Sequence, residues 1–134
     1  MKTILVVQPE PLVSGLFNRL LERGYSVVET TSAEEALDAF RRHGKVDLLI
    51  TELELPVISG IELASLLKAW RPRLKIILTA DLLPENWSDE ESAELSRFQT
   101  HSMTILKMPF SPDELRARVV SLIGFPESAF PAAA

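Results

Sequence analysis

The chain of 134 residues contains no cysteine, so disulfide bonds, thiolate metal sites and cysteine nucleophiles are excluded. Its two histidines, His43 and His101, lie far apart without the spacing of metal ligands, and we expect both to be solvated. No apolar run approaches the roughly 20 residues of a membrane span. The run at residues 4–7 is too short for the core of a signal peptide. These absences favour a cytoplasmic protein without a membrane segment.

Motifs for common chemistries are also missing, since the chain has no nucleophile elbow, P-loop or GxGxxG sequence. We therefore expect a protein that is not an enzyme. The net charge of −5 argues against nucleic acid as a partner. Basic residues gather at 41–45 and at 68–75, where two helices would end, and cations there complement the helix dipole.

The remaining pattern is that of one globular domain, with 46% hydrophobic and 25% charged residues. Apolar runs with the length of strands occupy residues 4–7, 25–28, 46–51, 75–79 and 103–106. A helical pattern follows each run. Four of these helices open with Ser-x-x-Glu, which satisfies the free N–H groups of a first turn; the serines are Ser32, Ser59, Ser88 and Ser111. We expect a full capping box at Ser32 and Glu35, and an inward position for Leu66.

Strands that alternate with helices predict an α/β fold, a three-layer αβα sandwich of the flavodoxin-like (βα)5 type. The five-stranded parallel sheet should have the order 2-1-3-4-5. Residues 1–124 would form the domain and residues 125–134 a tail or linker. Ligands of such sheets bind at the carboxyl ends of the strands. The sequence places there Gln8, Pro9, Glu10, Glu52, Glu54, Thr79, Asp81, Lys107 and Met108.

Several motifs resemble those of response-regulator receiver domains from bacterial two-component systems. They are ILVV at 4–7, SAEEAL at 32–37, DLLI at 47–50, Pro56 with SGIEL at 59–63, LTA at 78–80 and PFSP at 109–112. The resemblance extends to about Gly124. It implies a histidine kinase or another signalling protein as partner, and a homodimer through the fourth and fifth helices and the fifth strand. It also implies a cis peptide bond before Pro109.

In that family a kinase histidine passes a phosphoryl group to an aspartate at the end of the third strand. Two acidic residues after the first strand hold Mg²⁺, and a Thr or Ser and a Lys bind the phosphoryl oxygens. By the resemblance, Gln8 and Pro9 occupy the acid-pair positions, with Glu10 next to them. Glu52 stands at the phosphoacceptor position, one methylene longer than aspartate.

Thr79 retains the family's hydroxyl, but Met108 falls on the lysine position and Lys107 lies one residue early. Ile105 replaces the aromatic residue of the usual switch. These departures indicate a degenerate receiver, or pseudo-receiver, that is not phosphorylated in the normal way and acts through protein–protein contacts. We expect no cofactor and no bound Mg²⁺, because affinity in such sites depends on ligand charge.

Alternatives stay open at Glu52, which could mimic a phosphorylated aspartate, be inert, or still accept phosphate. The active alternative is a rearranged site of Glu10, Glu52 and Lys107 that binds phosphoryl and Mg²⁺. Weak metal candidates are Glu10, Glu52 and the backbone of Glu54. A flavin site is disfavoured because residues 8–11 lack Ser, Thr and Gly. In the long connection 80–87, Trp87 either anchors an interface or folds back over Thr79.

Overall fold

The computed structural model describes residues 1–82, 84–98 and 101–126. Its sheet contains five parallel strands in the order β2-β1-β3-β4-β5. The strands are β1 (Thr3–Val7), β2 (Ser26–Thr30), β3 (Leu48–Glu52), β4 (Lys75–Ala80) and β5 (Met103–Lys107). The predicted fold class and strand order are therefore confirmed.

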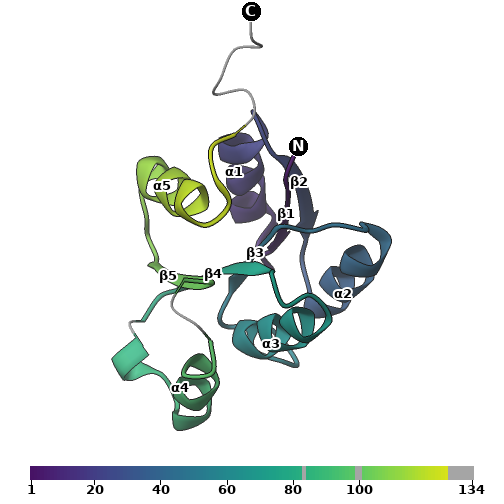
Figure 1. Ribbon diagram of the computed structural model, residues 1–134. Coiled ribbons are helices and arrows are strands. Elements are labelled where there is room, and N and C mark those ends of the chain that lie inside the picture. The colour runs from purple at the N-terminus through teal and green to yellow at the C-terminus, as the bar shows by residue number, and fades with distance from the viewer. Residues whose placement is uncertain (83, 99–100, 127–134) are drawn as a thin grey trace, which may run out of the picture.

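Helices cover both faces of this sheet and make three layers (Figure 1). On one face lie α1 (Pro11–Leu21) and α5 (Pro112–Ile123). On the other lie α2 (Ala33–Arg42), α3 (Gly60–Trp70) and the short α4 (Asp89–Leu95), which follows a 3₁₀ turn at Pro84–Asn86. In the described residues, no helix is long and apolar enough to cross a membrane.

Successive side chains of a strand point to opposite faces of the sheet, so alternate residues pack into two separate hydrophobic cores. Leu5 of β1 and Leu49 of β3 pack with the α2 and α3 side. Ile4 and Leu48, one residue earlier, pack with α1 and α5. Both faces are apolar, which explains why the strands read as continuous Val, Ile and Leu runs.

The four serine caps form as expected, since each side chain accepts the backbone N–H of the glutamate three residues later. The reciprocal half of the capping box is present at Ser88 and Ser111. It is not made at Ser32, where the prediction was wrong. There the Glu35 carboxylate instead accepts hydrogen bonds from the backbone and hydroxyl of Thr31.

Two further expectations about single side chains need correction. Leu66 is 48% exposed, because it lies on the outer side of α3. Tyr25 precedes β2 rather than starting it, and its hydroxyl donates to the Gly124 carbonyl at 2.8 Å. Of the predicted tail 125–134, residues 127–134 lie outside the described part of the chain.

Trp87 folds back onto the domain. Its side chain belongs to the core on the α2 and α3 side and is 9% exposed. The indole N–H donates to the Leu82 carbonyl at 3.0 Å. Trp87 is therefore no exposed interface anchor. It packs in the same core cluster as Leu78 and Ala80 of β4, on the α2 and α3 side, so the predicted cover over Thr79 stays a prediction.

Candidate functional site

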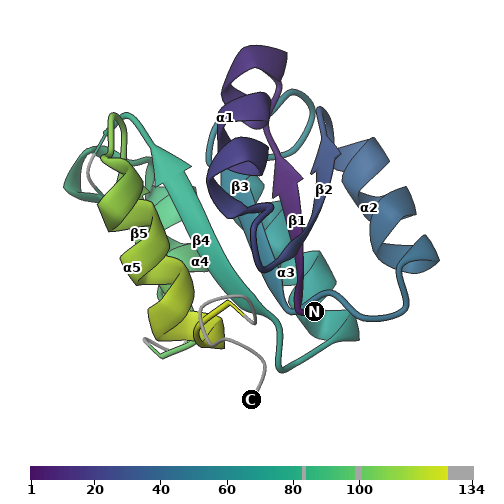
Figure 2. The ribbon, with the colours of Figure 1, turned by 90° about the horizontal axis from the view of Figure 1, so that it is seen from above.

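The carboxyl ends of the strands meet at one edge of the sheet, where the strand arrows end in Figure 2. A hollow of about 570 Å³ opens there. The residues predicted for this edge that line it are Gln8, Pro9, Glu10, Glu52, Glu54 and Met108. Thr79, Asp81 and Lys107 do not line it.

Gln8 and Glu52 face one another across the ends of β1 and β3. Gln8 is 4% exposed, and its side chain lies close enough to the Glu52 carboxylate to favour the charged form of that group. The carbonyl oxygen of the Gln8 side chain accepts the backbone N–H of Glu10 at 3.2 Å. This bond holds the Gln8 amide at the end of β1, next to Glu52.

The electrostatics of this pair are dominated by burial. Partial burial raises the pKa of Glu52 above its usual 4.5 because it disfavours the charged form. The hydrogen bond from Gln8 acts in the opposite direction, while the negative charges of Asp81 and Glu54 raise the pKa further. Glu52 is thus a carboxylate surrounded by other carboxylates.

Thr79 is the neighbour of Glu52 in the register of β3 and β4. Its side chain is buried, with 1% exposure, and its hydroxyl lies 3.5 Å from the Thr51 carbonyl. The Thr79 hydroxyl is thus directed toward the backbone of β3. The hydroxyl is therefore near the β3 terminus but outside the lining of the hollow.

Met108 is the residue before the cis peptide bond to Pro109, and the predicted cis bond is present. Its backbone N–H donates to the Ala80 carbonyl at 2.8 Å, which holds it at the edge of the sheet. Lys107 is exposed, and its Nζ lies 3.4 Å from the Met108 carbonyl. The structure thus places a thioether, and not an ammonium group, in the hollow with Glu52.

The residues at this edge do not fit a magnesium site. Pro9 has no side-chain ligand, Gln8 is uncharged and its oxygen already accepts the Glu10 backbone N–H, and Glu10 is exposed. Among the described residues, no group of three or more His, Asp or Glu side chains is placed to hold a metal ion. Mg²⁺ is held by carboxylate ligands, and neither Gln8 nor Pro9 supplies one at the positions next to Glu52.

The loop from Leu53 to Gly60 closes one side of the hollow, and sequence reasoning missed its constraints. The Gly60 N–H donates to the Leu53 carbonyl at 2.7 Å and ties the loop ends together. At the tip, Val57 is fully exposed with a positive φ of 75°. Ile58 N–H bonds the Pro56 carbonyl at 2.9 Å, so the tip is a tight three-residue turn. The Pro-to-Gly spacing was the available signal for a turn.

A second hollow of about 460 Å³ adjoins the first on the α1 side. It is lined mainly by apolar residues of α1 and of the segment that leads into α5, including Leu16, Phe17 and Phe110. Met108 lines both hollows and joins them. Next to them on α1, Leu12 is 80% exposed and Leu16 is 51% exposed.

Comparison with known proteins agrees with this architecture. Residues 4–120 match the family described as "Response regulator receiver domain". The response regulator TrrA of Thermotoga maritima, solved in complex with Mg(2+)-BeF, is 34% identical with a TM-score of 0.74. That match covers 92% of this chain and all of the other.

Among curated relatives, the alkaline phosphatase synthesis transcriptional regulatory protein PhoP of Bacillus subtilis is 33% identical over 132 residues. The match covers 97% of this chain and 52% of PhoP. The polar-differentiation response regulator DivK of Brucella ovis is 38% identical over 68 residues, which cover 50% of this chain and 54% of DivK. The chain spans about half the length of the curated relatives it matches.

Proposed function

This chain belongs to the response regulator receiver family of two-component systems, and we propose that it signals through protein contacts without phosphorylation at the usual position. The observation that carries the proposal is that Gln8, a buried and uncharged amide, lines the same hollow as Glu52. An amide at an acid-pair position supplies no carboxylate to hold Mg²⁺ next to Glu52. The domain then works as a non-enzymatic module without Mg²⁺ or another cofactor.

The chemistry of the hollow supports this proposal. An incoming phosphoryl group carries negative charge and would meet Glu52, Glu54 and Glu10. Met108 offers it no positive charge, and Lys107 lies outside the hollow. Like charges without a bridging cation repel, so phosphoryl transfer to Glu52 is disfavoured by the same groups that line the site.

For the contact surface we propose the apolar hollow of α1 with the exposed Leu12 and Leu16. A large exposed apolar patch on a soluble domain typically marks an interaction site. Met108 lines both this apolar hollow and the hollow that contains Glu52. A partner bound on α1 would therefore also touch the carboxyl edge of the sheet at Glu52. The partner we propose is a histidine kinase or another signalling protein. A homodimer through α4, β5 and α5 is the second contact that the family resemblance suggests.

The direct test is incubation of the protein with acetyl phosphate and Mg²⁺, followed by intact-mass measurement. We expect no added phosphoryl group on the wild type or on Glu52→Gln. A stable mass gain that Glu52→Gln abolishes would overturn the proposal in favour of the rearranged site of Glu10, Glu52 and Lys107. A mass gain that Glu52→Gln retains would also overturn it, by revealing another acceptor.

The contact surface is tested separately with histidine kinases from the same organism, mapped by hydrogen exchange. Binding should protect α1, and the double variant Leu12→Lys, Leu16→Lys should lose it while keeping the wild-type melting temperature. Both side chains are exposed, so the fold does not depend on them. Asp38→Ala, at an exposed position of α2 on the other face of the sheet, is the control and should keep the binding. Protection confined to α4 and α5 would contradict the α1 surface and favour the surface formed by α4, β5 and α5.

A further inference from the structure

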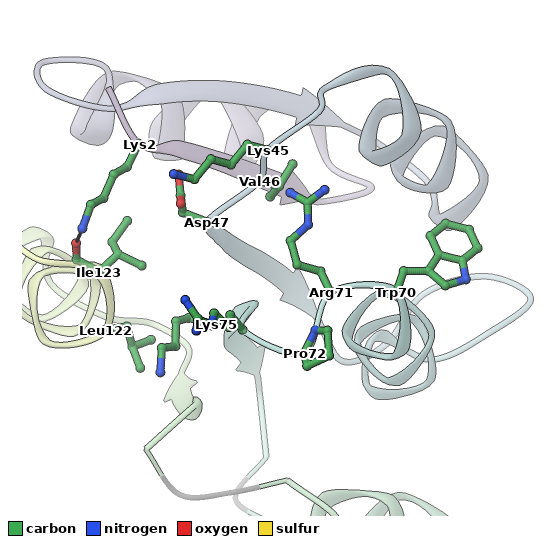
Figure 3. A pocket seen from close by; sticks show the side chains of 11 residues that line it. Lys2, Lys45, Val46, Asp47, Trp70, Arg71, Pro72, Lys75, Leu122 and Ile123 are labelled. Carbon is green, nitrogen blue, oxygen red and sulfur yellow. Dashed lines mark hydrogen bonds between the residues drawn. The ribbon is translucent and has the colours of Figure 1, made fainter.

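The opposite edge of the sheet, where the strands begin, carries a basic hollow of about 660 Å³ (Figure 3). Its cations come from separate parts of the chain: Lys2, Lys45, Arg71, Arg73 and Lys75. Hydrogen bonds between neighbouring strand starts hold these parts together, with Asp47 N–H to the Thr3 carbonyl at 2.9 Å and Lys75 N–H to the Asp47 carbonyl at 3.2 Å. Residues from both basic sequence clusters therefore meet in space.

Among the described residues, no carboxylate forms an ion pair with the cations of this hollow. Lys2 Nζ donates to the Ile123 carbonyl and Lys75 Nζ to the His101 carbonyl, which leaves their charges uncompensated. Asp47 is the one carboxylate in its lining, and Asp47 Oδ2 accepts the Thr3 backbone N–H at 2.8 Å. The recorded ion pairs of the described residues lie elsewhere, at Asp38–Arg42, Glu94–Arg97 and Asp113–Arg116. Five cations around one carboxylate, in a chain of net charge −5, concentrate positive potential at this edge.

Two further observations show unmet demand for an anion. The Arg71 guanidinium lies over the Phe40 ring, 5.0 Å from its centroid, and its Nη2 donates to the Gly44 carbonyl at 2.7 Å. Its positive charge is thus positioned by a ring and a backbone carbonyl, and no ion pair with a described carboxylate is present. Beside the hollow, burial and the nearby positive charge of Lys75 lower the pKa of Lys68. Burial is the larger of the two causes, and the second shows that Lys75 and Lys68 repel one another beside the hollow.

We propose that this hollow binds a small phosphorylated ligand with two or more negative charges, such as a polyphosphate chain or a nucleoside polyphosphate. The volume is that of a small-molecule site and too confined for a protein domain. Figure 3 shows Lys2, Lys45, Arg71 and Lys75 around one opening, so several cations can share one charged chain. Trp70, which is 51% exposed, lies at its rim beside Pro72. The proposal does not depend on the proposed signalling function.

The test is titration with sodium tripolyphosphate, followed by calorimetry and by the fluorescence of Trp70, at constant ionic strength set with NaCl. Saturable binding and a rise in melting temperature are expected, because a ligand of the folded state stabilises it. The double variant Lys45→Ala, Arg73→Ala should bind about tenfold more weakly or not at all. Both side chains are exposed, and the variant should melt as wild type does without ligand.

The matched control is Arg19→Ala, Arg116→Ala, which removes two positive charges from a different hollow. Its affinity for tripolyphosphate should stay within about twofold of wild type. Adenosine triphosphate distinguishes the ligand sources: tighter binding than tripolyphosphate identifies a nucleotide, and equal binding identifies the phosphate chain alone. No saturable binding by wild type, equal loss in the control variant, or preferential binding of duplex DNA would each overturn the proposal.

Discussion

A Cβ atom at Gly60 would lie 2.0 Å from the carbonyl oxygen of Glu52. The first residue of α3 is therefore packed directly on the backbone of the phosphoacceptor position. The neighbouring Leu53 carbonyl accepts the Gly60 N–H at 2.7 Å, so the two chain segments cannot separate without losing this bond. Glycine is required here by close approach, and its φ is not positive.

Gly60→Ala should consequently destabilise the domain by at least about 2 kcal/mol, because the obstructing atoms are backbone and cannot rotate away. Urea unfolding followed by circular dichroism measures this change. Gly15→Ala is the matched control, since nothing lies within 4 Å of a Cβ at that position in α1. It should stabilise the helix by about 0.5–1 kcal/mol. Equal effects of the two substitutions would contradict the close approach.

Val57 should be replaceable by glycine with a gain in stability. Its positive φ of 75° costs a β-branched residue about 1–2 kcal/mol, while glycine loses about 0.5–1 kcal/mol more backbone entropy on folding. The first effect is larger, so Val57→Gly should raise the free energy of unfolding by about 0.5–1 kcal/mol. Ala117→Gly, at an exposed position of α5, should instead lower it by about 1 kcal/mol. A loss of stability in Val57→Gly would show that the strained turn is not populated.

The sheet order was predictable because each strand in the sequence is followed by a helical pattern and both strand faces are apolar. The position of Glu52 followed from the same reasoning, since it ends an apolar run. What periodicity could not show was the direction of single side chains. Leu66 fits an apolar stripe of α3 but lies on its outer side. Trp87 sits in a polar segment, and only tertiary packing takes it into the core.

The basic hollow shows a different limit of the sequence. Lys45 follows α2, and Arg71, Arg73 and Lys75 follow α3, so each group taken alone is an ordinary set of cations near a helix end. Their convergence depends on β1, β3 and β4 starting side by side. Equally, no local pattern indicates that the Gln8 amide reaches Glu52. Both relationships join residues more than 25 positions apart.

The stability of the domain should depend on pH through Glu52. Its pKa is raised above 4.5 in the folded state, so its favourable contribution is complete below the usual value and is lost as pH rises through the raised pKa. At neutral pH the ionised side chain therefore costs stability. Glu52→Gln should raise the free energy of unfolding at about pH 7, and this gain should vanish at about pH 4.

Melting curves of wild type and Glu52→Gln across this pH range provide the measurement. The exposed Glu85, substituted as Glu85→Gln, controls for a general effect of removing one negative charge. Its difference from wild type should not follow the same rise between acid and neutral pH. A gain for Glu52→Gln that is as large at pH 4 as at pH 7 would contradict burial of the charged form as the cause.

If the scaffold is otherwise competent, restoring the family's residues at the site should restore Mg²⁺ binding and phosphoryl transfer. The variant Gln8→Asp, Pro9→Asp, Glu52→Asp, Met108→Lys places carboxylates and an ammonium group where the resemblance puts the acid pair, the acceptor and the lysine. Without metal, its clustered carboxylates should lower the melting temperature, and Mg²⁺ should raise it again because the ion binds the folded state. With acetyl phosphate and Mg²⁺, its mass should increase by one phosphoryl group, while wild type stays unchanged.

The control for this variant carries Glu52→Asn in place of Glu52→Asp. It keeps the two aspartates introduced after β1 as metal ligands but removes the carboxylate that would accept the phosphoryl group. It should bind Mg²⁺ more weakly and gain no mass. If the full variant binds Mg²⁺ and still takes up no phosphoryl group, the obstruction lies outside these four positions. The first candidate is then Thr79, whose hydroxyl lies 3.5 Å from the Thr51 carbonyl and outside the lining of the hollow. Uptake by wild type under the same conditions would instead contradict the assignment of a protein that signals without phosphorylation.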